Sequence, residues 1–162
     1  MRLAAVCAAS LVFCASAGAA LPSPGVLVPG RSLGGVRIGE PAAQVRASLG
    51  SSFGRCRGCD TATWYFTYGR FTQPGLAVEL ERGRVSGVWT IWSPRGWHDR
   101  RGVRLGATEA RVTSLAGPLV PVACSGYDAL VGDHGSVRTA YYVLAGKLWG
   151  FGLLPRRADP CR

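Results

Sequence analysis

The sequence is poor in negative charge and in the motifs of known catalytic sites. Nine acidic residues stand against nineteen basic ones, which gives a formal net charge of +10. No G-x-S-x-G, H-E-x-x-H or phosphate-binding loop occurs, so neither a serine-hydrolase nor a zinc-protease site has support from a motif. Nothing marks a glycosidase-like pair of carboxylates either. The sequence therefore predicts a protein that is not an enzyme and needs no cofactor, with an enzyme of unrecognised type as the weakest alternative.

Long apolar runs are missing after the first 20 residues. In residues 1–20 a single arginine, Arg2, precedes an apolar run that ends in small residues with A-x-A cleavage sites. This arrangement is typical of a signal peptide. The run is short and alanine-rich for a membrane span, and no later stretch approaches one. Cys14 follows Phe13, where a lipoprotein signal normally has a small residue. We therefore expect a cleaved, extracytoplasmic protein, secreted or in the cell envelope, with no transmembrane helix in the mature chain.

Lysine is nearly absent, and arginine supplies the positive charge. Lys147 is the single lysine beside eighteen arginines, which are scattered along the chain. A basic protein favours contact with anionic surfaces such as acidic proteins or wall polymers. Scattered arginines in an exported chain argue against nucleic acid, and a solvated basic surface is the simplest interpretation of the charge.

Two stretches of the chain resemble each other closely. Residues 35–50 read GVRIGEPAAQVRASLG, and residues 102–117 read GVRLGATEARVTSLAG. Further on, LAVELERGRVSGVWT (76–90) aligns with TAYYVLAGKLWGFGL (139–153). Because order, residue type and spacing recur, the sequence predicts a tandem repeat.

Each predicted unit begins with a short helix. Pro41 suits a first-turn position in the first unit, and Thr108 suits the N-cap of the second. Gly50 and Gly117 fit the left-handed residue that ends a helix. Apolar residues four positions apart would give each helix one buried face.

Three strands are expected after each helix. The second and third strands join through E-R-G-R (81–84) and L-A-G-K (144–147), which are tight turns with glycine at the same place. The predicted fold class is therefore α+β, made of two tandem helix-plus-three-strand antiparallel units. The helices should cover one face of the sheet and leave the other face open.

This organisation gives a predicted domain plan. Residues 1–20 are the signal peptide, and residues 21–33 are an N-terminal linker. Repeat unit 1 spans 34–92, a connector spans 93–101, and repeat unit 2 with the C-terminal tail spans 102–162.

The repeat resembles a known group of proteins. Its G-x-x-[IL]-G segment, a valine, a small-residue helix end and a meander look like the unit shared by BamE-like outer-membrane assembly lipoproteins and tandem beta-lactamase-inhibitor proteins. They look closer still to uncharacterised exported bacterial proteins with two such units. The resemblance implies a binding or assembly module, and the inhibitors of this group bind with the open sheet face. This chain departs from both named groups in its strong basicity and in lacking a good lipid-attachment site.

Four cysteines remain in the mature chain: Cys56, Cys59, Cys124 and Cys161. An even number in an exported protein predicts two disulfides, which can pair in three ways. Cys56 and Cys59 follow a helix and precede a strand, the reverse of a thioredoxin-type redox site. Cys124 falls in the equivalent loop of the second unit, so Cys161 is its natural partner. Pairs Cys56–Cys59 and Cys124–Cys161 are therefore favoured, while crossed pairings between units stay open.

A metal site has no support in the spacing of the cysteines and histidines. Zinc needs four ligands, and Cys124 and Cys161 do not form a second close pair. His98 and His134 show no ligand spacing either. We expect no metal.

Aromatic and arginine side chains are the candidate binding residues. Trp64 and Tyr65 are neighbours on a predicted strand and therefore point to opposite faces. The stretch 92–101 (WSPRGWHDRR) adds two tryptophans and three arginines that could dock an acidic partner, although Trp97 could also fill the seam between the units. The full set is Trp64, Tyr65, Trp92, Arg95, Trp97, Arg100 and Arg101.

The sequence thus predicts an exported, non-enzymatic binding module. Its partner should be a protein that binds to the open sheet face. An exported enzyme that the module inhibits is one such partner. The alternative is a basic cell-envelope protein that binds anionic wall polymer through its arginines. The oligomeric state has no sequence signal.

Overall fold

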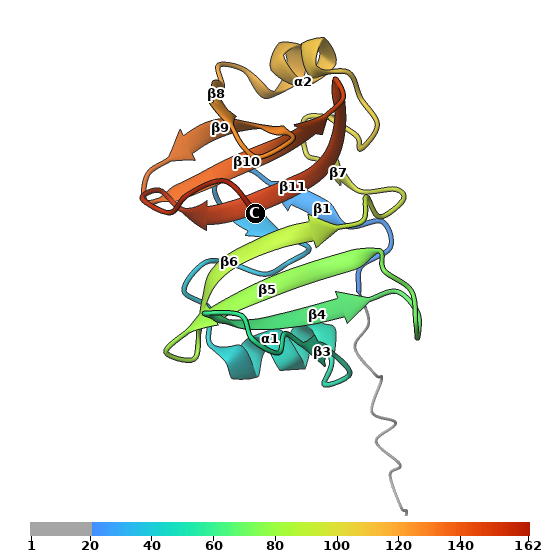
Figure 1. Ribbon diagram of the computed structural model, residues 1–162, viewed down its shortest axis with the longest axis vertical. Helices are drawn as coiled ribbons and strands as arrows, with labels where there is room; N and C mark the ends of the chain where they lie inside the picture. The colour runs from blue at the N-terminus through green and yellow to red at the C-terminus, as the bar shows by residue number, and fades with distance from the viewer. Residues whose placement is uncertain (1–20) are drawn as a thin grey trace, which may run out of the picture.

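The computed structural model describes residues 21–162, and the predicted signal peptide with Cys7 and Cys14 lies outside this range. Strand makes up 44% and helix 11% of the structure. Eight antiparallel strands form one sheet (Figure 1). Their order is β3 (Gly54–Arg55), β4 (Ala62–Thr67), β5 (Gly75–Glu81), β6 (Arg84–Ile91), β11 (Lys147–Pro155), β10 (Val137–Leu144), β9 (Asp128–His134) and β8 (Val120–Ala123).

A second, small sheet lies against the large one. It is made of β2 (Ser32–Leu33), β1 (Val26–Val28) and β7 (His98–Asp99). Strand β1 pairs with β7 in parallel, which joins the N-terminal segment to the chain between the two halves of the large sheet. The N-terminal segment is therefore part of the folded body.

The two helices are short, and a glycine follows each as predicted, while Pro41 is the N-cap of the first helix instead of a first-turn residue. Helix α1 is Ala42–Leu49 and helix α2 is Glu109–Ala116. The Thr108 hydroxyl accepts the N–H of Arg111, which confirms it as the N-cap of α2. Gly50 and Gly117 follow the helices at φ 88° and 83°, a left-handed region that favours glycine.

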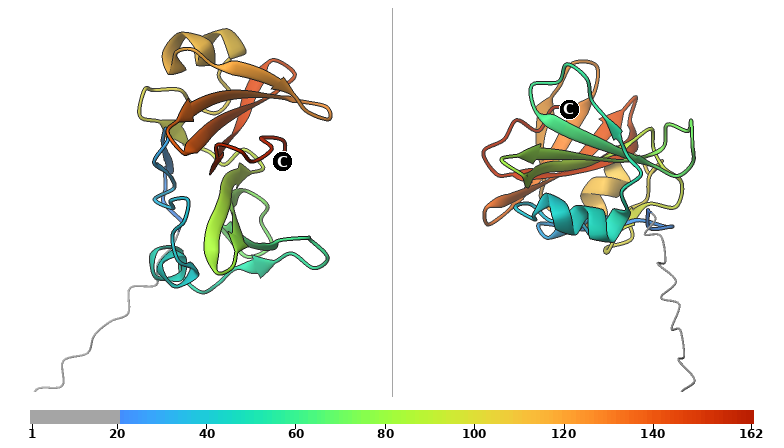
Figure 2. Two further views of the ribbon diagram at one scale, coloured as in Figure 1. Left: turned by 90° about the vertical axis from the view of Figure 1, so that its left-hand side faces the viewer. Right: turned by 90° about the horizontal axis from the view of Figure 1, so that it is seen from below.

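The main core lies on one face of the large sheet, which we call the closed face. Both helices and the small sheet cover this face, as Figure 2 shows from the side. Val45 and Leu49 of α1, and Val112 and Ala116 of α2, are buried in it. Apolar side chains four positions apart lie on one side of a helix, so each helix needs only one such pair to attach to the sheet.

The opposite face of the large sheet, which we call the open face, carries a smaller apolar cluster. Ala129, Val131, Ala140 and Tyr142 are buried there. The C-terminal tail (residues 156–162) leaves the end of β11 and turns back across this face (Figures 1 and 2). The open face is therefore partly covered by the chain's own end.

The predicted α+β class and its two helix-plus-three-strand units are wrong. Strands dominate the structure, and β3 and β8 add an edge strand to each half that the sequence analysis did not foresee. Strands β6 and β11 then pair across the middle, so one continuous sheet replaces two separate units. The reason is physical: two eight-residue helices cannot cover eight strands, and the small sheet provides the rest of the cover.

Two segments of the predicted domain plan contain strands of the small sheet. The segment predicted as a linker, 21–33, contains β1 and β2, and the connector 93–101 contains β7. Neither described helix is long and apolar enough to cross a membrane.

Candidate functional site

A hollow of about 260 Å³ lies on the open face where β6 and β11 separate. These strands pair directly at only two positions, Gly152 with Trp89 and Leu153 with Val88. We call this space the aromatic hollow. Its lining residues are Trp89, Thr90, Ile91, Trp92, Tyr142, Trp149 and Arg162.

A threonine side chain replaces the next backbone bond between the two strands. The Phe151 N–H donates to the Thr90 hydroxyl at 2.9 Å, and this bond is buried. Because a side chain takes the place of a ladder carbonyl, β6 and β11 can diverge without leaving this amide unpaired.

Glycines on β11 make room for the Tyr142 ring. A Cβ on Gly152 would lie 2.4 Å from the Tyr142 hydroxyl, and one on Gly150 would lie 3.3 Å from the Tyr142 ring. The W-G-F-G stretch therefore alternates a bulky residue with a glycine so that Tyr142 can lie flat across the strand.

Arg162 of the C-terminal tail forms one wall of the aromatic hollow. Its guanidinium lies 5.6 Å from the centre of the Trp89 ring and 3.8 Å from the Glu79 carboxylate. The backbone of Arg162 also hydrogen-bonds the Tyr127 hydroxyl. A cation over a tryptophan face is an attractive contact. The end of the tail is therefore held by this cation–π contact, by the ion pair with Glu79 and by the backbone hydrogen bonds to Tyr127.

Two polar groups in the wall of the hollow are buried without a hydrogen-bond partner among the described residues. They are the Tyr142 hydroxyl and the Trp149 Nε1. Burial raises the pKa of Tyr142 well above its ordinary value, with Arg162 acting in the opposite direction. A buried polar group left unpaired is costly, so this wall offers hydrogen bonds that the chain itself does not use.

The structure separates Trp64 and Tyr65, as expected for neighbours on a strand. Trp64 belongs to the closed face, where its ring stacks on Phe53 at 4.2 Å between ring centres and lies 5.5 Å from the Arg46 guanidinium. Only 8% of Trp64 is exposed. Tyr65 is half-buried on the other face of the sheet, so it is the member of this pair that a partner could touch.

Trp92 and Arg95 are the predicted residues that the structure brings together. Both line a further shallow hollow beside Tyr68, and Trp92 also lines the aromatic hollow. Trp92 is 63% exposed and has a φ of 52°, a region that costs an ordinary residue energy. Its ring therefore stands on the rim between the two hollows.

Trp97, Arg100 and Arg101 do not join that rim. Trp97 is 1% exposed in the main core, where its Nε1–H donates to the Tyr68 hydroxyl. Arg100 has an exposed side chain, and its N–H donates to the Leu27 carbonyl. The Arg101 guanidinium donates to the carbonyl of Ala116, the last residue of α2. Trp97 thus lies in the main core, and Arg101 stabilises a helix end.

Histidine and aspartate are adjacent in the sequence at two places, His98–Asp99 and Asp133–His134. Neither forms an acid–base pair among the described residues. Both carboxylate oxygens of Asp99 accept hydrogen bonds from other groups, namely the N–H groups of Arg101 and Val103 and the Tyr141 hydroxyl. The His98 ring lies 3.1 Å from the Gly96 carbonyl instead. Within residues 21–162, no three His, Cys, Asp or Glu side chains gather as a metal site requires.

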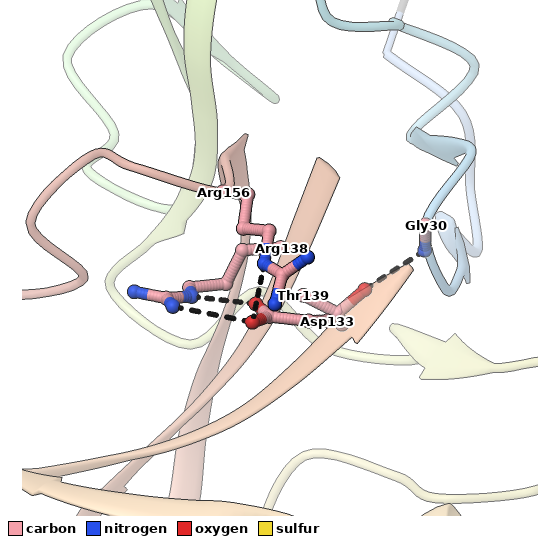
Figure 3. A network of polar contacts seen from close by, with 5 residues as sticks. All are labelled: Gly30, Asp133, Arg138, Thr139 and Arg156. Carbon is pink, nitrogen blue, oxygen red and sulfur yellow. Dashed lines mark hydrogen bonds and ion pairs between the residues drawn. The ribbon is translucent and has the colours of Figure 1, made fainter. Parts of the chain in front are cut away.

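The second pair, Asp133–His134, ends strand β9. Asp133 is bound by two arginines, with Arg138 Nε at 2.8 Å and Arg156 Nε at 3.1 Å from its carboxylate (Figure 3). These cations lower the pKa of Asp133, the hydrogen bond from Arg138 being the largest cause. Around them lies a space of about 680 Å³, which we call the basic hollow, with Ser136 and Arg157 also in its lining.

The disulfides join the cysteine pairs that the sequence favoured. Cys56–Cys59 closes the loop between β3 and β4, and Cys124–Cys161 ties the C-terminal tail to the end of β8. The second bridge therefore holds the residue next to Arg162 at the edge of the aromatic hollow.

Sequence reasoning missed most of the aromatic hollow. Trp89, Tyr142 and Trp149 were recognisable as aromatic residues on strands, but their meeting depends on the pairing of β6 with β11. No local pattern predicts that pairing. The repeated glycines of W-G-F-G, beside aromatic neighbours, were the one available signal of a close approach.

No family model and no curated protein matches the chain. A DUF4309 family protein (YjgB) from Bacillus subtilis is similar in structure, with a TM-score of 0.53, 17% identity, and coverage of 70% of this chain and 77% of that one. An extracellular protein containing a SCP domain from Bacillus anthracis has a TM-score of 0.53 and 10% identity over 74% of this chain.

A cysteine-rich secretory protein (SAV1118) from Staphylococcus aureus is also similar, with a TM-score of 0.48 and 11% identity over 86% of this chain. The present chain spans 44% and 49% of the lengths of the SCP-domain protein and the secretory protein. These findings overturn the resemblance to BamE-like and beta-lactamase-inhibitor repeats, because the neighbours are other, mostly-sheet proteins. At such low identity the similarity shows a shared fold and nothing finer.

Proposed function

We propose that this chain is an exported, non-enzymatic module that binds a protein partner on the open face of its large sheet. The aromatic hollow is the anchor site for an apolar side chain of that partner. The observation that carries the proposal is the hollow itself: three tryptophans line about 260 Å³ of space outside the main core. Tryptophan and tyrosine are the residues most enriched at the energetic centres of protein interfaces.

The polar groups of the hollow support the same function. A partner group with a lone pair could accept a hydrogen bond from Trp149 Nε1, and the Tyr142 hydroxyl can donate or accept. Both atoms are buried, so a partner reaches either group only when the side chains that cover it move. Binding would then exchange two unpaired groups for two hydrogen bonds.

Export is supported by the apolar N-terminal run of the sequence and by the two disulfides, since disulfides persist mainly in oxidising compartments. One structural neighbour is an extracellular protein that contains a SCP domain. The cell-envelope alternative shares this location and differs in the partner, which would be an anionic wall polymer.

The test is to capture partners from the native secretome and then measure affinity with purified components. Trp92→Ala should weaken the complex about tenfold or more, as expected for an interface anchor. Phe71→Ala is the matched control, because Phe71 is also exposed, at 94%, and does not line the hollow. Equal binding by both variants would overturn the proposed site. Salt-sensitive binding to wall polymer, with no saturable protein complex, would favour the envelope alternative.

A further inference from the structure

The basic hollow is a candidate second contact on the open face. One carboxylate, Asp133, holds two guanidinium groups there: Arg138 through Nε at 2.8 Å and Nη2 at 3.4 Å, and Arg156 through Nε at 3.1 Å. A guanidinium has five N–H groups, so most of those on Arg138 and Arg156 remain for a ligand. Arg157 lines the same space with a further cation.

The charges of this cluster do not cancel. Asp133 neutralises one of the two arginines that it holds, and its pKa is lowered by them, so it stays ionised at neutral pH. With Arg157, the hollow keeps two positive charges in excess. Because Asp133 and Arg138 are direct cross-strand partners on β9 and β10, their spacing is fixed by the sheet.

The two hollows lie on the same face of the sheet. Arg138 and Tyr142 are four residues apart on β10, and alternate residues of a strand point to one face, so the two side chains are about 13 Å apart. The C-terminal tail starts at Arg156 in the basic hollow and ends at Arg162 in the aromatic one. An extended segment of four to five residues would span them.

We propose that the basic hollow binds carboxylates of an acidic segment in the same protein partner whose apolar side chain enters the aromatic hollow. This inference rests on the proposed function and names the chemistry of its partner. Arginine forks fit carboxylates through paired, charge-assisted hydrogen bonds. The fork of Arg138 on Asp133 already shows that geometry within the chain.

The probe is a hexaglutamate peptide added to the isotope-labelled full chain, followed by the NMR signals of the arginine Nε–H groups. Saturable shifts should appear for Arg138 and Arg156. Arg156→Gln with Arg157→Gln should weaken binding about tenfold, the loss expected from two charge-assisted contacts. Arg37→Gln with Arg111→Gln removes the same charge from exposed positions elsewhere and should change the affinity less than about twofold.

Asp133→Asn separates an ordered site from diffuse attraction. The substitution raises the net positive charge, so diffuse attraction predicts tighter binding. Loss of the group that holds both arginines predicts weaker binding, about fivefold, if the site is ordered. Tighter binding would overturn the inference, and so would inorganic polyphosphate binding the hollow while hexaglutamate does not.

Failure here can be told apart from failure of the proposed function. If hexaglutamate does not bind but the partner still depends on Trp92, the basic hollow alone is wrongly assigned. If the partner binds equally well to Trp92→Ala, the aromatic hollow is wrongly assigned, whatever hexaglutamate does.

Discussion

Tyr141 and Tyr142 are neighbours on β10, yet they lie in opposite environments. Tyr141 points to the closed face, where its hydroxyl donates to Asp99 Oδ2 at 2.9 Å. Tyr142 points to the open face, where its hydroxyl is buried without a partner in the described chain. The buried tyrosine hydroxyl on the closed face is thus paired within the chain. The open face has apolar cover but unmet hydrogen bonds, as expected of a surface that a partner completes.

Removing the disulfide that ties the C-terminal tail to the sheet should have the largest effect on stability. Replacing Cys124 and Cys161 by serine should lower the free energy of unfolding by about 4 kcal/mol, because this bridge closes a long loop. Replacing Cys56 and Cys59 should cost about 2 kcal/mol, since that loop is short. Urea denaturation measures both, and an equal or larger loss for the second pair would contradict the assignment of the tail bridge as the main staple.

Among substitutions on the closed face, those of Asp99 should lower the free energy of unfolding most. Asp99→Ala leaves the N–H groups of Arg101 and Val103 and the Tyr141 hydroxyl without their acceptor. We expect a loss of about 3 kcal/mol in the free energy of unfolding. Asp99→Asn keeps one acceptor oxygen and should cost clearly less; equal costs for the two variants would show that these hydrogen bonds matter little.

The two tyrosines give the sharpest form of the comparison. Tyr141→Phe should cost about 1–2 kcal/mol, because it removes a buried hydrogen bond. Tyr142→Phe should leave stability unchanged within about 0.5 kcal/mol or raise it, because the hydroxyl it removes is unpaired. Chemical denaturation of the two single variants is the measurement, and a larger loss for Tyr142→Phe would mean that the open face is as complete as the closed one.

The smallest effect concerns acid. In the folded chain the pKa of Asp133 lies below the ordinary 3.8, so its ion pairs contribute stability above that value and lose it as pH falls through the lowered pKa. The difference in urea midpoint between the native chain and Asp133→Asn should therefore be present near neutral pH and shrink in acid. A difference that is constant with pH would contradict the role of the arginines.

Local features of this fold could be predicted from the sequence, whereas the assembly could not. The glycine turns after Glu81 and Leu144 and the glycine ends of both helices depend on nearby residues, and the structure confirms them. The edge strand β8 begins at Val120 and contains Pro121, which weakens its strand signal. The joining of β6 to β11 at Trp89 depends on contacts far apart in the chain.

The candidate site shows the same limit. Trp92 and Arg95 were predicted and do lie together, because they are close in sequence. Trp64 and Trp97 were predicted as well, but burial in the main core removes them from any surface. Arg162 escaped notice, since its place over Trp89 is set by a disulfide and by Tyr127 rather than by any pattern around it.

The left-handed backbone at Trp92 has a consequence for library selection. The side chain is largely exposed, and its φ of 52° would suit glycine better. A library sorted for expression or heat resistance would therefore accept many residues at position 92, glycine among them. A library sorted for capture of the partner should return tryptophan. A difference between the two selections would show that tryptophan at position 92 serves binding rather than folding.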